Sequence, residues 1–95
     1  MALTLDDPLV KSEDALCREL EAEAVLLNLR TGVYYGLNPV GTRAWQLLGE
    51  HMRLARVADV MLDEFEVERA VLERDLLALG TQLLDSGLCR LQQPA

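Results

Sequence analysis

The chain has 95 residues, of which 51% are hydrophobic and 26% charged, and its formal net charge is −7. This length is enough for one domain with a modest core, and too short for a deep enzyme cleft covered by a lid. An acidic surface repels phosphate backbones and anionic membranes, so the composition argues against nucleic acid and lipid headgroups as partners. No segment has the pattern of a signal peptide or of a membrane span, and we therefore expect a cytoplasmic protein.

We expect a single domain over residues 1–95, with a loosely ordered lead-in from Met1 to Pro8. The next segment fits two structures. Leu9, Leu16 and Leu20 lie at helical spacing, whereas Leu16–Leu20 also fits a strand. Two strands alone are marginally stable, and the hairpin that follows needs a third. We therefore adopt the strand, with the helix as the open alternative.

A β-hairpin is indicated by two apolar runs with a break between them. Ala24–Leu29 is apolar except at one position, and Val33–Tyr35 has β-favouring side chains. The break, Arg30–Gly32, contains a glycine, which tolerates the positive φ of a tight connection. These residues predict two adjacent antiparallel strands.

A helix is expected to begin directly after the hairpin. Asn38 is a good N-cap residue, and Pro39 suits the first helical position, where its missing N–H is harmless. Apolar residues then recur at helical spacing as far as Leu48, and Gly49 follows as a C′ residue. We expect Trp45, within this helix, to lie in the core.

Two more helices are predicted from apolar periodicity, at Leu54–Phe65 and at Glu68–Ser86. Phe65 is expected to be buried. Gly80 lies within the last helix and indicates either a close approach of another backbone or a tolerated weakness. After Gly87, the short apolar tail Leu88–Leu91 can fold back on the core.

The predicted fold class is α+β: a three-stranded antiparallel sheet followed by three helices, in a winged helix-turn-helix-like arrangement. A winged-helix DNA-binding regulator is therefore the alternative function. The charges of the last helix argue against it, because only Arg69 and Arg74 are basic there. They stand among four acidic residues: Glu68, Glu73, Asp75 and Asp85.

The sequence predicts no catalytic residue, cofactor or metal site. Cys17 and Cys89 have no ligand-like spacing and are interpreted as reduced packing residues, with a disulfide as the less favoured alternative. His51 is the only histidine and is interpreted as a solvated residue of a polar turn.

Several motifs resemble the small chaperones of the pyrroloquinoline-quinone biosynthesis protein D family. They are Thr31-Gly32, Tyr35, Leu37-Asn38, Gly41, Trp45, Leu47-Leu48, Asp75–Leu79 and Leu83–Leu88. Family members are recognition elements for ribosomally made, post-translationally modified peptides (RiPPs). The resemblance, over about Leu16 to Leu91, implies a non-catalytic adaptor that binds the leader segment of a precursor peptide and presents it to a maturation enzyme. Tyr34–Gly41 is most similar to the free-standing proteins of lasso-peptide pathways, which serve a leader peptidase, and less similar to the quinone-cofactor branch.

The resemblance also implies a binding mode, in which an extended leader adds to the third strand and lies against the third helix. Carried over, the peptide-binding residues are Val33, Tyr34, Tyr35, Gly36, Leu72, Leu76 and Leu79, with Arg69, Arg74 and Asp75 at the rim. The alternative, that these leucines belong to the core, stays open. A free sheet edge also makes a homodimer conceivable.

Overall fold

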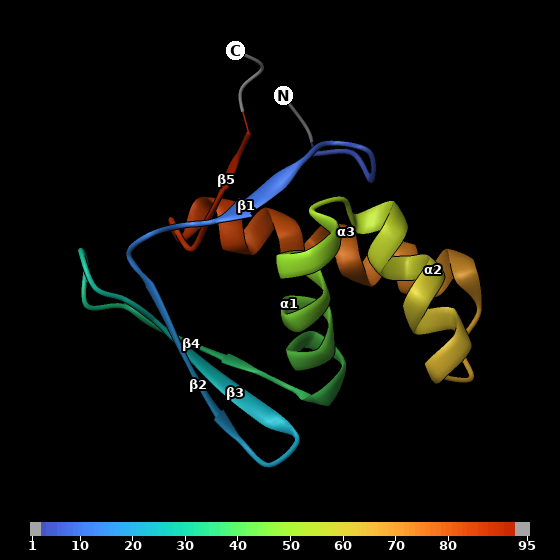
Figure 1. Ribbon diagram of the computed structural model, residues 1–95, viewed down its shortest axis with the longest axis horizontal. Coiled ribbons are helices and arrows are strands. Elements are labelled where there is room, and N and C mark those ends of the chain that lie inside the picture. The colour runs from blue at the N-terminus through green and yellow to red at the C-terminus, as the bar shows by residue number, and fades with distance from the viewer. Residues whose placement is uncertain (1–2, 93–95) are drawn as a thin grey trace.

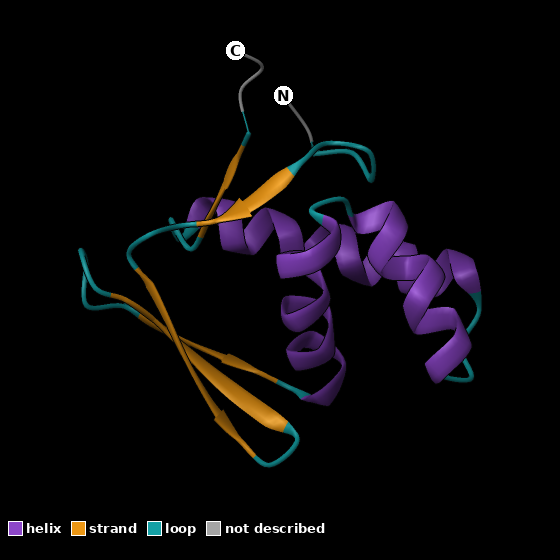
Figure 2. Cartoon of the chain, viewed as in Figure 1, coloured by secondary structure: helices purple, strands orange, loops and turns teal. Residues whose placement is uncertain are grey.

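The computed structural model describes residues 3–92 and shows the expected α+β architecture (Figures 1 and 2). Three antiparallel strands are followed by three helices, and a short strand stands at each end of this arrangement. In chain order the elements are β1 (Leu9–Lys11), β2 (Ala15–Leu20), β3 (Glu23–Asn28), β4 (Tyr34–Leu37), α1 (Pro39–His51), α2 (Leu54–Glu64), α3 (Arg69–Asp85) and β5 (Cys89–Leu91).

Helix α1 is the central element of the fold. The β2–β3–β4 sheet lies on one side of it and α2 on the other, while α3 crosses behind (Figure 1). Trp45 and Leu48 of α1 are buried, as are Leu54 of α2 and Leu83 of α3. The core therefore forms where the three helices meet, and the sheet covers one flank of it.

The sheet has the order β2-β3-β4, with both neighbouring pairs antiparallel. Leu16–Leu20 lies in β2, so the strand interpretation is confirmed and the helical alternative is wrong. Burial alternates along β3, where Ala24 and Leu26 are buried and Leu27 on the opposite face is only partly covered. One face of the sheet packs on α1, and the other meets solvent.

Asn28 closes the hairpin and joins the sheet to α3. Its side-chain oxygen accepts hydrogen bonds from the backbone N–H groups of Arg30 and Thr31, and Gly32 takes a φ of 76°. Its side-chain amide donates to the carbonyl oxygen of Ser86 at 2.8 Å. A buried asparagine with these partners fixes the turn and holds the end of the sheet against the end of α3.

The ribbon of β1 and β5 was not predicted. The two strands pair in antiparallel fashion through Leu9 and Leu91, and Leu9 is almost fully buried. Residues 3–8 also contact the helices, because the carbonyl oxygen of Leu5 accepts a hydrogen bond from the N–H of Ala55. A Cβ at Gly80 would come within 2.7 Å of Leu3, so this glycine permits the close approach of the N-terminal segment.

The predicted end of α1 was wrong. Asn38 caps the helix as expected, since its side-chain oxygen accepts from the N–H of Gly41 at 2.7 Å. The helix continues through Gly49 to His51, and it ends at Met52, which has a φ of 64°. The carbonyl oxygen of Met52 accepts a hydrogen bond from the N–H of Leu9 in β1 at 2.7 Å. This distant contact holds the left-handed residue in place and sets where the helix stops.

Phe65 is the other correction. It lies just past α2, in extended conformation, and is only partly buried rather than buried as expected. Because the helix ends at Glu64, Phe65 does not continue the buried face that includes Leu54 and Met61. Trp45 is buried as predicted, and the ammonium of Lys11 lies 4.6 Å from the centre of its ring.

Candidate functional site

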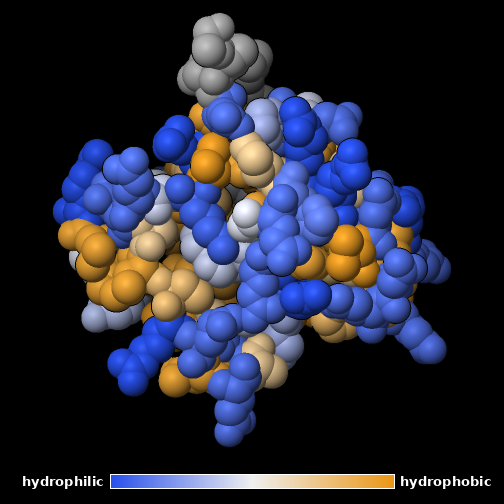
Figure 3. Space-filling view, viewed as in Figure 1, coloured by the Kyte–Doolittle hydropathy of each residue, from blue (hydrophilic) through white to orange (hydrophobic). Residues whose placement is uncertain are grey.

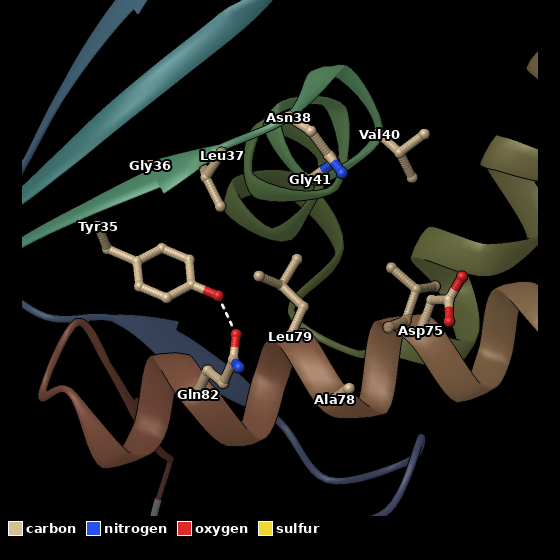
Figure 4. A pocket seen from close by; sticks show the side chains of 11 residues that line it. Tyr35, Gly36, Leu37, Asn38, Val40, Gly41, Asp75, Ala78, Leu79 and Gln82 are labelled. Atoms are coloured by element: carbon tan, nitrogen blue, oxygen red, sulfur yellow. Dashed lines mark hydrogen bonds between the residues drawn. The ribbon is translucent and has the colours of Figure 1, made fainter.

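A groove of about 330 Å³ has two walls (Figure 4). The end of β4 and the start of α1 form one wall, and α3 forms the other. We call it the β4–α3 groove. Its size is at the lower end for pockets that hold small ligands or side chains, roughly 300 Å³. It is lined by Tyr35, Gly36, Leu37, Asn38, Val40, Gly41, Asp75, Leu76, Ala78, Leu79 and Gln82.

The strand beside the groove is an edge of the sheet. The N–H of Asn28 donates to the carbonyl oxygen of Val33, so these two residues form a hydrogen-bonded pair. Along an antiparallel ladder, hydrogen-bonded pairs alternate with pairs that form no hydrogen bonds with each other. The backbone groups of Tyr35 and Leu37 therefore point toward β3, and those of Tyr34 and Gly36 point away from it. Two N–H and two C=O groups of β4 are thus directed to the open side, where another strand could pair.

Side chains alternate along the same strand. Tyr35 and Leu37 face the helices, and Leu37 is buried. Tyr34 projects from the opposite face and is 70% exposed. Gly36 leaves open space, since a Cβ there would meet nothing within 4 Å. The solvent-facing side of β4 is therefore open beside Tyr34.

The two ends of the groove differ chemically (Figure 4). At one end the Tyr35 hydroxyl donates a hydrogen bond to the side-chain oxygen of Gln82, so β4 and α3 are bridged there. At the other end the carboxylate of Asp75 lies on α3 and Val40 lies on α1. Leu79 lies between these ends and provides an apolar centre.

The structure brings five of the ten predicted site residues into the groove: Tyr35, Gly36, Asp75, Leu76 and Leu79. Leu76 has a double role, because it lines the groove while its side chain is only 1% exposed. Leu76 is therefore both a groove residue and, as the alternative interpretation expected, a core residue. Leu79 is partly buried and more accessible.

The other five lie outside the groove. Val33 precedes β4, Tyr34 belongs to its edge but projects to the far face, and Leu72 is a core residue. Arg69 is held by Asp59 of α2 at 3.0 Å and by Glu73 at 3.4 Å. Arg74, beside the groove, is 75% exposed and lies 3.7 Å from Asp75.

Six lining residues were missed by the sequence analysis: Leu37, Asn38, Val40, Gly41, Ala78 and Gln82. Gln82 lies three positions after Leu79 and therefore on the same face of the helix, so the helical spacing could have predicted it as a site residue. Asn38, Val40 and Gly41 were assigned only to the start of a helix, and nothing local places that start opposite α3.

The groove offers backbone hydrogen-bonding groups and apolar side chains. Within residues 3–92, no three His, Cys, Asp or Glu side chains are grouped so that they could hold a metal ion. Burial raises the pKa of the Cys89 thiol to about 12, and burial is also the main cause that raises the pKa of Cys17. Neither thiol lines the groove. In the part of the chain that the structure describes, no helix is long and apolar enough to cross a membrane.

Comparison with known proteins places this geometry in a family context. The family model described as coenzyme PQQ synthesis protein D (PqqD) matches residues 23–88. One similar solved structure is TbiB1 in complex with the TbiA(beta) leader peptide, with 36% identity, a TM-score of 0.77, and coverage of 90% of this chain and 96% of that one. Another is a lasso peptide synthetase B1 complexed with the leader peptide, with 31% identity, a TM-score of 0.77, and coverage of 87% and 98%. No curated protein matched the chain.

Proposed function

Because this chain belongs to the coenzyme PQQ synthesis protein D (PqqD) family, we propose that it is a RiPP recognition element that binds the leader segment of a precursor peptide in the β4–α3 groove. The bound leader is an extended strand that pairs with β4. The protein itself performs no chemistry on the peptide. It presents the leader to a maturation enzyme in the cytoplasm, where precursor peptides are made.

The observation that carries this proposal is the open edge of β4 beside an apolar recess. The outward backbone groups of Tyr34 and Gly36 would form hydrogen bonds with any sequence, which supplies affinity. The side chains of Leu37 and Leu79 would accept alternate side chains of the added strand, which supplies selectivity. Two solved structures with over 30% identity to this chain hold a leader peptide, which supports the same class of ligand here.

A proline scan at the edge tests the strand pairing. Gly36→Pro removes the outward N–H, and Gly36→Ala keeps it while adding a side-chain atom in open space. We expect Gly36→Pro to bind a labelled TbiA(beta) leader peptide about tenfold more weakly than Gly36→Ala, since one net hydrogen bond contributes about 1 kcal/mol and the ring also disturbs its neighbours. Fluorescence anisotropy measures this, with circular dichroism as the control for folding.

The apolar recess is tested at Leu79 rather than at Leu76, whose burial would confuse binding with folding. Leu79→Asp should strongly weaken binding of the same peptide, because the bound peptide would bury an unpaired charge. Equal binding by folded Gly36→Pro, Leu79→Asp and parent proteins would contradict the proposal, and so would a parent that binds no leader peptide.

We further propose that the enzyme served is a leader peptidase of a lasso-peptide pathway rather than an enzyme of the quinone-cofactor pathway. Support comes from the two neighbours, one of which is described as a lasso peptide synthetase component. The test is the rate at which a leader peptidase of a lasso-peptide pathway cleaves its precursor peptide. We expect the rate to rise when this protein is added and to stay at the basal value with Gly36→Pro.

A further inference from the structure

We propose that Asp75 makes the β4–α3 groove selective for leader segments in which a basic residue lies two positions from an apolar anchor. This inference rests on the proposed function and names the kind of peptide that the groove prefers. The apolar anchor occupies the recess over Leu79, and the basic side chain meets the carboxylate of Asp75.

The charge of the groove comes from one side chain. Among the lining residues that the structure describes, Asp75 is the only one with a formal charge. Its nearest cation is Arg74, whose Nε lies 3.7 Å from the Asp75 Oδ1, beyond hydrogen-bonding distance, and both side chains are largely exposed. Arg69, the other basic residue of α3, is already engaged with Asp59 and Glu73. Among the described residues, the Asp75 carboxylate is therefore engaged only in its exposed ion pair with Arg74, which a cation from a peptide can replace.

Two other polar side chains of the groove already use one of their hydrogen-bonding groups within the protein. The Tyr35 hydroxyl donates to Gln82, and the side-chain oxygen of Asn38 accepts from the N–H of Gly41. A polar peptide side chain would have to displace these bonds to use the same groups. Electrostatic preference is therefore expected at the Asp75 end, and not at the end bridged by Tyr35 and Gln82.

The spacing follows from the geometry of the two elements. Asp75 and Leu79 are four residues apart on α3, which is a rise of about 6 Å along the helix. Residues i and i+2 of a strand point to the same side and are about 6.7 Å apart. In Figure 4, Gln82, Leu79 and Asp75 follow one another along α3 below the line from Tyr35 to Val40. A strand that follows this line with an apolar side chain over Leu79 thus brings its second neighbour to Asp75.

A selection from random peptides displayed on phage tests the preference across many sequences at once. The baits are the parent, Asp75→Lys, and Asp63→Lys as a control that makes the same charge change at an exposed position of α2. Bound peptides are sequenced, and only those that fail to bind Gly36→Pro are counted as groove ligands. We expect the peptides selected by the parent and by Asp63→Lys to contain an apolar residue with Lys or Arg two positions away. The peptides selected by Asp75→Lys should contain Asp or Glu in that second position.

A selected peptide and its Lys→Gln version are then titrated against the parent and Asp75→Asn. We expect the Lys→Gln change to weaken binding to the parent roughly fivefold, as for a partly exposed ion pair, and to have little effect with Asp75→Asn. The difference should shrink as salt is raised.

The outcomes separate this inference from the function on which it rests. Groove ligands with an apolar anchor but no charge preference, or the same ligands for the parent and Asp75→Lys, would overturn the role of Asp75 and leave the proposed function standing. A selection that yields no groove ligand at all would contradict both.

Discussion

One face of the β2–β3–β4 sheet packs on α1, while its other face and its outer strands meet solvent; the β1–β5 ribbon, by contrast, is anchored in the helical core. Leu9 of β1 and Cys89 of β5 are 1% and 3% exposed, whereas Leu16 of β2 and Tyr34 of β4 are 53% and 70% exposed. Apolar surface is visible at the side where the larger sheet lies (Figure 3). β2 has no buried residue and β4 has only Leu37, so the outer strands of the larger sheet are less covered than the shorter strands of the ribbon.

The difference indicates which part of the molecule maintains the fold and which part remains available to a partner. The ribbon holds the two ends of the described chain together and contacts α1 and α3. Two side-chain hydrogen bonds join the larger sheet to α3 and its C-cap: that of Tyr35 with Gln82 and that of Asn28 with Ser86. Between these contacts and the start of α1 lies the β4–α3 groove. A natural protein with an open edge of this kind usually protects it, and a bound strand would do so.

The largest expected effect separates the two regions by stability. Leu54→Ala, at a fully buried position of the helical core, should lower the free energy of unfolding by about 2–5 kcal/mol. Leu16→Ala, on the exposed face of the sheet, should change it by less than about 0.5 kcal/mol. Urea unfolding followed by circular dichroism measures both. Comparable losses for the two variants would show that the exposed face is covered in solution.

A smaller effect is expected from two glycines. Gly80→Val should destabilise the protein by about 1–3 kcal/mol, because the new atoms would meet Leu3, Leu54 and Leu9. Gly36→Val has open space around it and a strand conformation that suits a β-branched residue, so stability should stay equal or rise slightly. Thermal unfolding measures the pair. A stable Gly80→Val variant would mean that the N-terminal segment can leave α3 at little cost.

The smallest expected effect is a difference in the alkylation rates of the two thiols, with no change in stability. At pH 8 the Cys89 thiol, with a pKa of about 12, is almost entirely protonated as well as buried, so it should react with iodoacetamide only when the protein unfolds. Cys17 in β2 is half-buried and should react first, though more slowly than a free cysteine because its pKa is also raised. Mass spectrometry of the alkylated protein over time distinguishes them. Equal rates would show that the β1–β5 ribbon opens readily.

Local sequence alone determined the elements whose signals lie within a few residues. The cap at Asn38, the turn ending at Gly32 and the close of α3 at Gly87 are backbone requirements of single positions, and all three were predicted. The apolar spacing of α2 and α3 was equally informative, because a helix that buries one face must repeat about every 3.6 residues. Leu16–Leu20 was placed in a strand because the hairpin needed a third one.

Only the tertiary structure decided the features that depend on contacts between distant residues. Strands of three residues carry too little pattern to be read, and β1 exists because β5 pairs with it from the other end of the chain. The same strand fixes Met52 and so extends α1 past Gly49, where the local pattern ended it. The groove has the same origin: Asn38 and Val40 line it only because packing brings the start of α1 opposite Leu79 and Asp75. Sequence periodicity specifies a helix and its buried face, but the side chains that meet across a groove are chosen by the packing of one element on another.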